Sequence, residues 1–168
     1  LIGFKETKNY LKRCKCIFTD TPLRSQFYTE NNLPQWVPLG EGPLLLIMGG
    51  SQGARGINQI IEESLEFLIK NNFRIVHIVG DDMSSRFTKL RNYIQVKFTT
   101  EIAALIQNCD LVISRAGSGA INEIIQSKKP SILIPYPNSK NNHQEKNALV
   151  IVSNGGGILI NQNLNSKY

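Results

Sequence analysis

Beyond Pro43 the chain alternates between short apolar runs and longer segments in which apolar residues recur every three or four positions. Such runs are typical of buried strands, and the spacing is typical of helices that bury one stripe. The predicted strands are 44–48, 74–79, 94–98, 111–114, 131–135 and 157–160, and the predicted stripes are Ile57, Ile60, Ile61, Leu65 and Leu68, then Ile102, Leu105, Ile106 and Cys109, then Ile121, Ile124 and Ile125. Because apolar strands alternate with helices, we expect a parallel sheet covered on both faces, a doubly wound α/β fold.

The first 42 residues are organised differently. Residues 31–42 contain Pro34, Pro38 and two glycines, which are typical of a linker, and we place a boundary near residues 38–43. We therefore expect 1–42 to be the end of a preceding domain with its linker, and 43–168 to be a ligand-binding domain that is incomplete at its C-terminus. The missing initial Met and the stop soon after a predicted strand favour a piece of a longer protein.

The chain is basic, with a formal net charge of +6 at pH 7. Near its start, one acid, Glu6, is outnumbered by five basic residues, Lys5, Lys8, Lys12, Arg13 and Lys15. An anionic membrane surface attracts such a cluster by about 1 kcal/mol per basic residue, so peripheral membrane binding is predicted, with a solvated basic face as the alternative. Nucleic acid is not an expected partner, because no aromatic-interleaved basic motif accompanies the cluster.

The sequence predicts neither a membrane span nor a secretory leader, because no apolar run approaches about 18 residues and no basic, apolar leader opens the chain. Cys14, Cys16 and Cys109 are an odd number of cysteines, which favours reduced thiols in a cytosolic setting. The C-x-C pair lacks the second pair of ligands that a structural zinc site requires. We therefore expect no metal site.

Two glycine-rich loops follow predicted strands and precede predicted helices, at 49–55 and 115–120. Glycine lets a ligand approach the main chain, and the start of a helix offers free N–H groups and the positive end of its dipole. Each helix end is worth about 0.3 to 1 kcal/mol to an anion, and up to about 2 kcal/mol when partly buried. Two such loops predict a diphosphate site, and the alternative is that the glycines only shape tight turns.

Other nucleotide motifs fit these loops poorly. The first loop reads G-G-x-x-G, and in the second Asn122 stands where a dinucleotide fingerprint has its third glycine. A P-loop requires Gly-Lys-Ser/Thr, which neither loop has. A dinucleotide-dependent oxidoreductase is therefore a weaker alternative, and an NTPase is not expected.

Polar residues near the loops suggest further ligand contacts. Glu123 lies about one and a half turns into the predicted helix and could accept hydrogen bonds from a ribose diol. His143 and Gln144, in the polar segment 138–147, suit the hydroxyls of a neutral sugar. His77 is interpreted as a satisfied core or surface residue, and the adjacent acids Asp81 and Asp82 as a helix-starting turn.

Three motifs in order, MGGSQGAR, CDLVISRAGSGAINE and KPSILIPYPNSKNNHQEKNA, resemble the donor-binding half of the MurG family, bacterial transferases that convert lipid I to lipid II. The resemblance runs from about residue 1 to residue 162. It implies the two-domain GT-B arrangement, in which the C-terminal Rossmann-like domain binds UDP-N-acetylglucosamine. Residues 1–42 would then be the end of the acceptor domain with the interdomain linker.

By resemblance, the phosphates would be bound by the first loop at Ser51, Gln52 and Gly53 and by the second loop, Gly117, Ser118, Gly119, Ala120, Ile121 and Asn122. Glu123 would bind the ribose, backbone near Thr99 the uracil, and Gln144 with His143 the sugar hydroxyls. Arg24 would pair with the donor near its phosphates. Asp20 replaces the glycine that starts the family's G-x-P-x-R segment, so either the turn shifts or the Asp20 carboxylate partly neutralises Arg24.

The resemblance implies inverting transfer of N-acetylglucosamine to the muramyl 4-hydroxyl of lipid I, without a cofactor, in peptidoglycan synthesis at the cytoplasmic face of the bacterial plasma membrane. The catalytic residue is unknown, because the general base is expected in the acceptor domain before Leu1. The fragment alone is therefore expected to bind donor but scarcely to turn over. The principal alternative is a non-catalytic nucleotide-binding module docked at a membrane.

Overall fold

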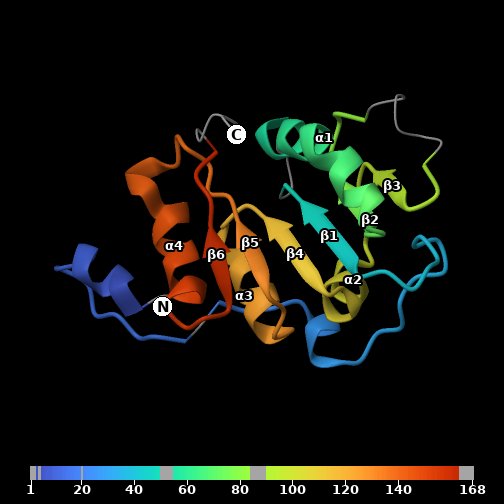
Figure 1. Cartoon of the computed structure of the whole chain (residues 1–168). Helices are drawn as coiled ribbons and strands as arrows, with labels where there is room; N and C mark the ends of the chain where they lie inside the picture. The colour runs from blue at the N-terminus through green and yellow to red at the C-terminus, as the bar shows by residue number, and fades with distance from the viewer. Residues whose placement is uncertain (1–2, 4, 20, 50–54, 84–89, 163–168) are drawn as a thin grey trace.

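The computed structural model describes residues 3, 5–19, 21–49, 55–83 and 90–162. Among these residues, six parallel strands are hydrogen-bonded in the order β3-β2-β1-β4-β5-β6 (Figure 1). They are β1 (Leu44–Met48), β2 (Arg74–Ile78), β3 (Tyr93–Val96), β4 (Leu111–Ser114), β5 (Ser131–Leu133) and β6 (Gly157–Leu159). All six predicted strands are present, and the predicted α/β fold is confirmed.

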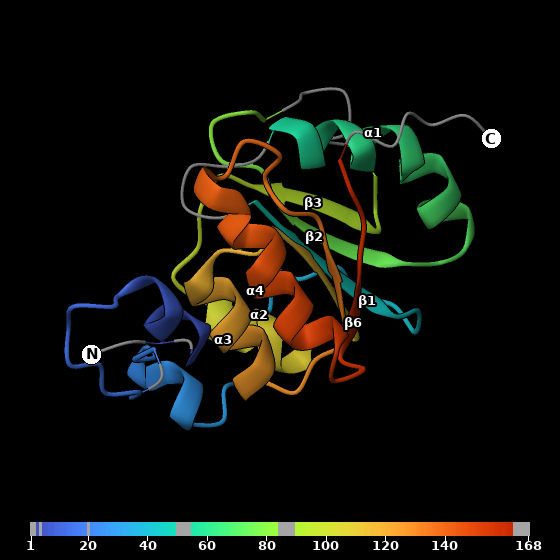
Figure 2. The ribbon, with the colours of Figure 1, turned by 90° about the vertical axis from the view of Figure 1, so that its left-hand side faces the viewer.

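Helices cover both faces of this sheet. They are α1 (Arg55–Lys70), α2 (Ile102–Asn108), α3 (Ser118–Gln126) and α4 (His143–Val152), with short 3-10 helices η1 (Lys5–Tyr10), η2 (Ser25–Tyr28) and η4 (Lys140–Asn142). Figure 2 shows α1 on one side of the sheet and α2, α3 and α4 on the other. Because the strands are parallel, their carboxyl ends lie at one edge of the sheet. The helices that follow the strands begin at this edge.

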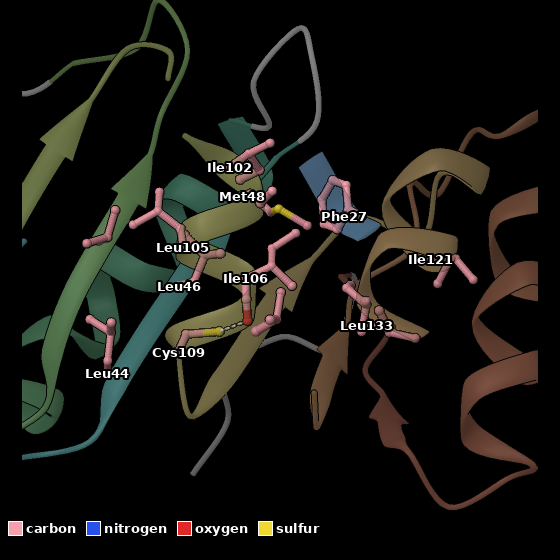
Figure 3. Packing of buried hydrophobic residues seen from close by; sticks show 14 of the residues in the cluster. Phe27, Leu44, Leu46, Met48, Ile102, Leu105, Ile106, Cys109, Ile121 and Leu133 are labelled. Carbon is pink, nitrogen blue, oxygen red and sulfur yellow. Dashed lines mark hydrogen bonds between the residues drawn. The ribbon is translucent and has the colours of Figure 1, made fainter. Parts of the chain in front are cut away.

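The central strand β1 supplies side chains to both layers of the core. Leu44, Leu46 and Met48 join the cluster beneath α2, α3 and α4 (Figure 3). Leu45 and Ile47 point the other way and pack against the α1 stripe. This alternation follows from the period of two residues in a strand, and burial on both faces explains the unbroken apolar run.

The predicted strands 74–79 and 157–160 each end one residue beyond β2 and β6, and three larger differences need correction. The strand predicted at 94–98 begins at Tyr93 and ends at Val96, and Phe98 is 73% exposed. The strand predicted at 131–135 ends at Leu133, close to Pro135, whose nitrogen cannot donate to a ladder. Ile125, predicted to lie in a buried stripe, is 46% exposed, because Ile121 and Ile124 already occupy the side of α3 that faces the sheet.

Residues 24–37 lie against α2 and α3. Phe27 is buried in the core beneath these helices. The backbone N–H of Asn31 donates to Gln107 Oε1 at 3.1 Å, and the indole N–H of Trp36 donates to Glu101 Oε2 at 2.7 Å. These contacts fix the segment beside the helices that open onto the candidate site.

Within the described residues, every helix falls short of the length and apolarity that a membrane crossing requires. The three cysteines are free thiols. Cys109 is buried, and burial raises the pKa of its thiol to about 12, which makes it unreactive.

Candidate functional site

The two glycine-rich loops leave the sheet from neighbouring strands. Met48, the last residue of β1, is paired with Ser114, the last residue of β4. Between these two strands the strand order reverses direction, and open α/β sheets bind ligands at such a point. Residues 50–54 of the first loop lie outside the described residues, so the predicted contacts of Ser51, Gln52 and Gly53 are not located.

The second loop ends at the open start of α3. Gly117 is the N-cap residue, with φ −65° and ψ 148° and no side-chain capping bond. The first intrahelical bond runs from the Ile121 N–H to the Gly117 carbonyl at 3.0 Å, so the amides of Ser118, Gly119 and Ala120 precede the helical ladder. These amides and the helix dipole favour an anion.

Neither Gly117 nor Gly119 is required by packing. A Cβ atom added at either glycine would meet nothing within 4 Å among the described residues. Gly117 also has a negative φ that any residue can adopt. The open space above them is what the approach of a ligand to the backbone would need.

Two asparagines hold the backbone of this loop. Asn147 Nδ2, from α4, donates to the Ala116 carbonyl at 3.0 Å, and Asn122 Nδ2 donates to the Ser118 carbonyl at 2.7 Å. Ala116 is fully buried. Asn122, predicted as part of the phosphate loop, thus supports the first turn of α3, and Asn147 is a contact that sequence reasoning missed.

Arg115 lies in the second glycine-rich loop, but the sequence prediction gave it no role in the site. Its side chain is 7% exposed and donates to the carbonyls of Ile134 and Pro135, at 3.0 and 3.1 Å, and to Gln162 Oε1 at 2.6 Å. Its guanidinium also lies 5.6 Å from the centroid of the Tyr136 ring. Arg115 therefore ties together the ends of β4, β5 and β6. The available signal was an arginine directly after an apolar strand.

The Arg115 guanidinium is a buried positive charge beside the proposed anion site. Burial lowers its pKa from the ordinary value, but arginine remains a cation at neutral pH. The oxygens that accept hydrogen bonds from it, on Ile134, Pro135 and Gln162, are neutral carbonyl and amide oxygens. Its charge therefore adds to the positive potential at the carboxyl ends of the strands.

Glu123 and Arg24 are brought together by the fold. Arg24 Nη2 and Nε donate to Glu123 Oε1 at 2.6 and 3.0 Å. The sequence placed both residues at the donor site but assigned them to different parts of the ligand. Asp20, expected to influence Arg24, lies outside the described residues.

The loop between β5 and α4 lies at the same edge of the sheet as the Gly117 turn, because β4 and β5 are parallel. Gln144 Oε1 accepts the Tyr136 backbone N–H at 2.9 Å, and His143 Nδ1 lies 2.9 Å from the Lys140 carbonyl. Because a carbonyl only accepts, this histidine nitrogen must carry the proton. A pocket of about 290 Å³ adjoins the loop and is lined by Pro135, Tyr136, Pro137, Ser139, Asn142, Glu145, Asn161 and Gln162.

Thr99 lies between β3 and α2, at the same edge of the sheet. Its hydroxyl accepts the Glu101 N–H at 3.0 Å, which fixes the turn into α2. The neighbouring Phe98 is 73% exposed. An exposed aromatic ring beside the segment predicted to recognise uracil is a further feature that sequence reasoning missed.

His77 is a core residue whose two ring nitrogens are both hydrogen-bonded, which confirms the first of the two interpretations of this residue. It is 1% exposed, and its ring nitrogens lie 2.9 Å from Tyr93 Oη and 3.0 Å from Asn58 Oδ1. Asn58 Nδ2 donates to the Val79 carbonyl, so Asn58 Oδ1 accepts from His77 Nε2. Burial lowers the pKa of His77 to about 4. The neutral ring therefore links β2 to the first turn of α1.

Gly80 and Asp81 lie in a turn that Asp82 follows, and the residues directly after Met83, where the predicted helix would start, lie outside the described residues. Asp81 forms an ion pair with Lys97, whose hydrogen bond lowers the pKa of the aspartate. In the part of the chain that the structure describes, no three His, Cys, Asp or Glu side chains are grouped to hold a metal ion.

The chain is similar in sequence to curated proteins that share one name. The protein named UDP-N-acetylglucosamine--N-acetylmuramyl-(pentapeptide) pyrophosphoryl-undecaprenol N-acetylglucosamine transferase is 68% identical over 169 residues in Prochlorococcus marinus strain MIT 9312 and 66% identical over 169 residues in strain MIT 9215. Each alignment covers 99% of this chain and 47% of the relative. The chain thus spans about half the length of the curated relatives it matches.

A solved structure shows the same fold. The crystal structure of Acinetobacter baumannii MurG superposes with a TM-score of 0.66 over 74% of this chain and 38% of that one, at 23% identity. The resemblance inferred from the three motifs is confirmed by these relatives. Residues 44–167 match the glycosyltransferase family 28 C-terminal domain, and the chain therefore belongs to that family.

Proposed function

We propose that this chain binds UDP-N-acetylglucosamine and that its diphosphate occupies the open start of α3. The observation that carries the proposal is the uncapped turn at Gly117, whose glycines face open space where the strand order reverses. Ser51, Gln52 and Gly53 would complete the phosphate site from the neighbouring loop. The buried charge of Arg115 supports an anionic ligand.

The other donor groups are assigned to residues around this turn. Glu123 would accept the ribose hydroxyls, and backbone near Thr99 would recognise uracil, with Phe98 available to pack on the base. The Gln144 oxygen is already engaged with the Tyr136 N–H, so a sugar hydroxyl would meet its amide NH₂ group. His143 stands beside it at the start of α4.

The reaction proposed for the longer protein is transfer of N-acetylglucosamine from UDP to lipid I, by attack of the muramyl 4-hydroxyl on the anomeric carbon with inversion. Negative charge grows on the diphosphate as UDP departs. The start of α3 would then stabilise the transition state more than the ground state. Support comes from the names of the relatives, of which this chain covers 47%.

Isothermal titration calorimetry tests the donor assignment. We expect the folded chain to bind UDP and UDP-N-acetylglucosamine and not NAD, because the diphosphate, ribose and uracil contacts act together. Circular dichroism and an unfolding transition establish that the sample is folded. A folded sample that binds NAD but not UDP would refute the assignment.

We further propose that residues 8–18 dock on an anionic membrane surface at the cytoplasmic face of the plasma membrane. Lys8, Lys12, Arg13 and Lys15 are exposed, and the same segment exposes Leu11, Ile17 and Phe18 by 39%, 54% and 41%. Basic and apolar side chains together suit the boundary between headgroups and acyl chains.

Pelleting with vesicles tests this docking. We expect binding to vesicles that contain phosphatidylglycerol, weaker binding at high salt, and little binding to neutral phosphatidylcholine vesicles. Replacing Lys12, Arg13 and Lys15 by Gln should weaken binding to the anionic vesicles. The matched control replaces Lys70, Lys128 and Lys129 by Gln and should leave this binding unchanged. Binding that ignores both lipid charge and salt would contradict the proposal.

A further inference from the structure

Gln162 lies beyond β6, yet its side chain contacts residues next to both of the predicted phosphate loops. Its Oε1 accepts a hydrogen bond at 2.6 Å from Nη2 of Arg115, the residue that opens the second loop. Its amide also packs directly on Gly56, the second residue of α1. In Figure 2 the chain beyond β6 runs towards α1. One side chain therefore joins two segments that follow different strands.

The contact with Gly56 is close enough to require a glycine. A Cβ atom added there would overlap the carbon, nitrogen and oxygen of the Gln162 side-chain amide. Glycine inside a helix is less favourable than alanine by about 0.5 to 1 kcal/mol, and the close approach of Gln162 gives a physical reason for it here. The N–H groups of the first turn of a helix have no partner within the helix. Gln162 thus lies against the turn of α1 that would offer N–H groups to an anion.

The contact with Arg115 holds the second loop. Arg115 is buried, and its Nη1 donates to the carbonyls of Ile134 and Pro135, whereas its Nη2 donates to Gln162. A buried donor that loses its acceptor costs about 1 to 3 kcal/mol, so the Gln162 amide is needed to keep the guanidinium in this position. Arg115 precedes Gly117, the N-cap residue of α3, by two positions. Holding the arginine therefore also holds the path of the chain into α3.

We propose that Gln162 is a positioning residue that fixes the starts of α1 and α3 relative to each other. This inference rests on the proposed function and adds to it a residue that acts on the diphosphate without binding it. The attraction of a helix end for an anion falls off within the first turn, so both starts must be placed correctly for one diphosphate. The pairing of β1 with β4 fixes where the two loops begin. Gln162 fixes the helix starts that follow, through Gly56 and Arg115.

Ligands that differ in their phosphates test this role. Ligand-detected NMR measures the binding of UDP, inorganic pyrophosphate and uridine to the parent chain and to Gln162→Met. Methionine has a similar length, but its sulfur is only a weak acceptor for the Arg115 donor. We expect UDP and pyrophosphate to bind about three- to tenfold more weakly, which is the effect of losing about one hydrogen bond. Uridine should change by about twofold or less, because only the phosphates use the two helix starts.

A second substitution reaches the same side chain from α1. Gly56→Ala adds a Cβ atom that displaces the Gln162 amide, the movable end of a flexible side chain, while alanine itself favours the helix. We expect Gly56→Ala to weaken the binding of UDP by the same factor as Gln162→Met. The double variant should bind UDP no more weakly than either single variant, because both substitutions remove the same contact.

The matched control is Asn154→Ala, which removes a hydrogen bond to the Val150 carbonyl at the end of α4 remote from the site and should leave UDP binding unchanged. Circular dichroism establishes that every variant is folded. Three results would overturn the inference while leaving donor binding intact: unchanged UDP binding by Gln162→Met, equal losses for uridine and UDP, and losses that multiply in the double variant. If the folded parent chain binds no UDP, the proposed function itself fails.

Discussion

Acid should destabilise this protein through His77, beginning at a pH above that at which carboxylates titrate. Burial lowers the pKa of His77 from its ordinary 6.5 to about 4, so the ring stays neutral in the fold while the unfolded chain takes up a proton. The unfolded state then binds more protons between these values, and stability rises with pH. The contribution is fully present above pH 6.5 and is lost as pH falls towards 4.

The magnitude follows from the same two values. Each pH unit between them is worth about 1.4 kcal/mol, so the free energy of unfolding should fall by about 3 kcal/mol between pH 6.5 and 4. Glu66 and Asp81 have pKa values lowered below 4.5 and 3.8, by Lys70 and Lys97, so they titrate at the acid end of this range. Measurements between pH 4.5 and 7 therefore isolate the histidine.

Urea unfolding at half-unit pH intervals provides the measurement. His77→Gln should lose about 1 to 3 kcal/mol at pH 7, because it disturbs the bonds to Tyr93 and Asn58, and its stability should depend less on pH. The two proteins should therefore converge towards pH 4.5. Equal pH slopes for the two proteins, or a parent chain whose stability is constant from pH 7 to 4.5, would refute the reasoning.

Four other substitutions distinguish ligand binding from packing. Gly119→Val should keep the fold, because a Cβ atom there meets nothing within 4 Å. It should weaken the binding of UDP, measured by calorimetry, by more than about tenfold. Gly157→Ala should lower the free energy of unfolding in urea by at least about 2 kcal/mol, because its Cβ would lie 2.3 Å from the Ser131 carbonyl oxygen. Gln162→Glu should place a carboxylate at the position of Gln162 Oε1, 2.6 Å from Arg115 Nη2. The new negative charge offsets that of Arg115, so UDP binding should weaken without loss of stability. Gln162→Ala removes the hydrogen bond and should lower the free energy of unfolding by about 1 to 3 kcal/mol. Unchanged UDP affinity in Gly119→Val or Gln162→Glu, or unchanged stability in Gly157→Ala, would contradict the corresponding contact.

The order of strands and helices was readable from the sequence because it depends on local pattern. The unbroken run Leu44–Met48 required burial on both faces, and the spacing of Ile57, Ile61 and Leu65 required one buried helical stripe. Element ends were less predictable, as Phe98 and Ile125 show. Their exposure depends on which surface a neighbouring element covers, and the local pattern does not contain that information.

The candidate ligand-binding loop could also be proposed from the sequence, since its glycines and the helix start that follows are local features. What only the tertiary structure decided is which side chains meet there. Arg24 reaches Glu123 because Phe27 anchors a distant segment against α2 and α3, and Arg115 turns inward because the ends of β5 and β6 present carbonyl and amide oxygens to it. A local pattern determines the elements through backbone geometry, whereas contacts between charged side chains depend on the packing that brings remote segments together.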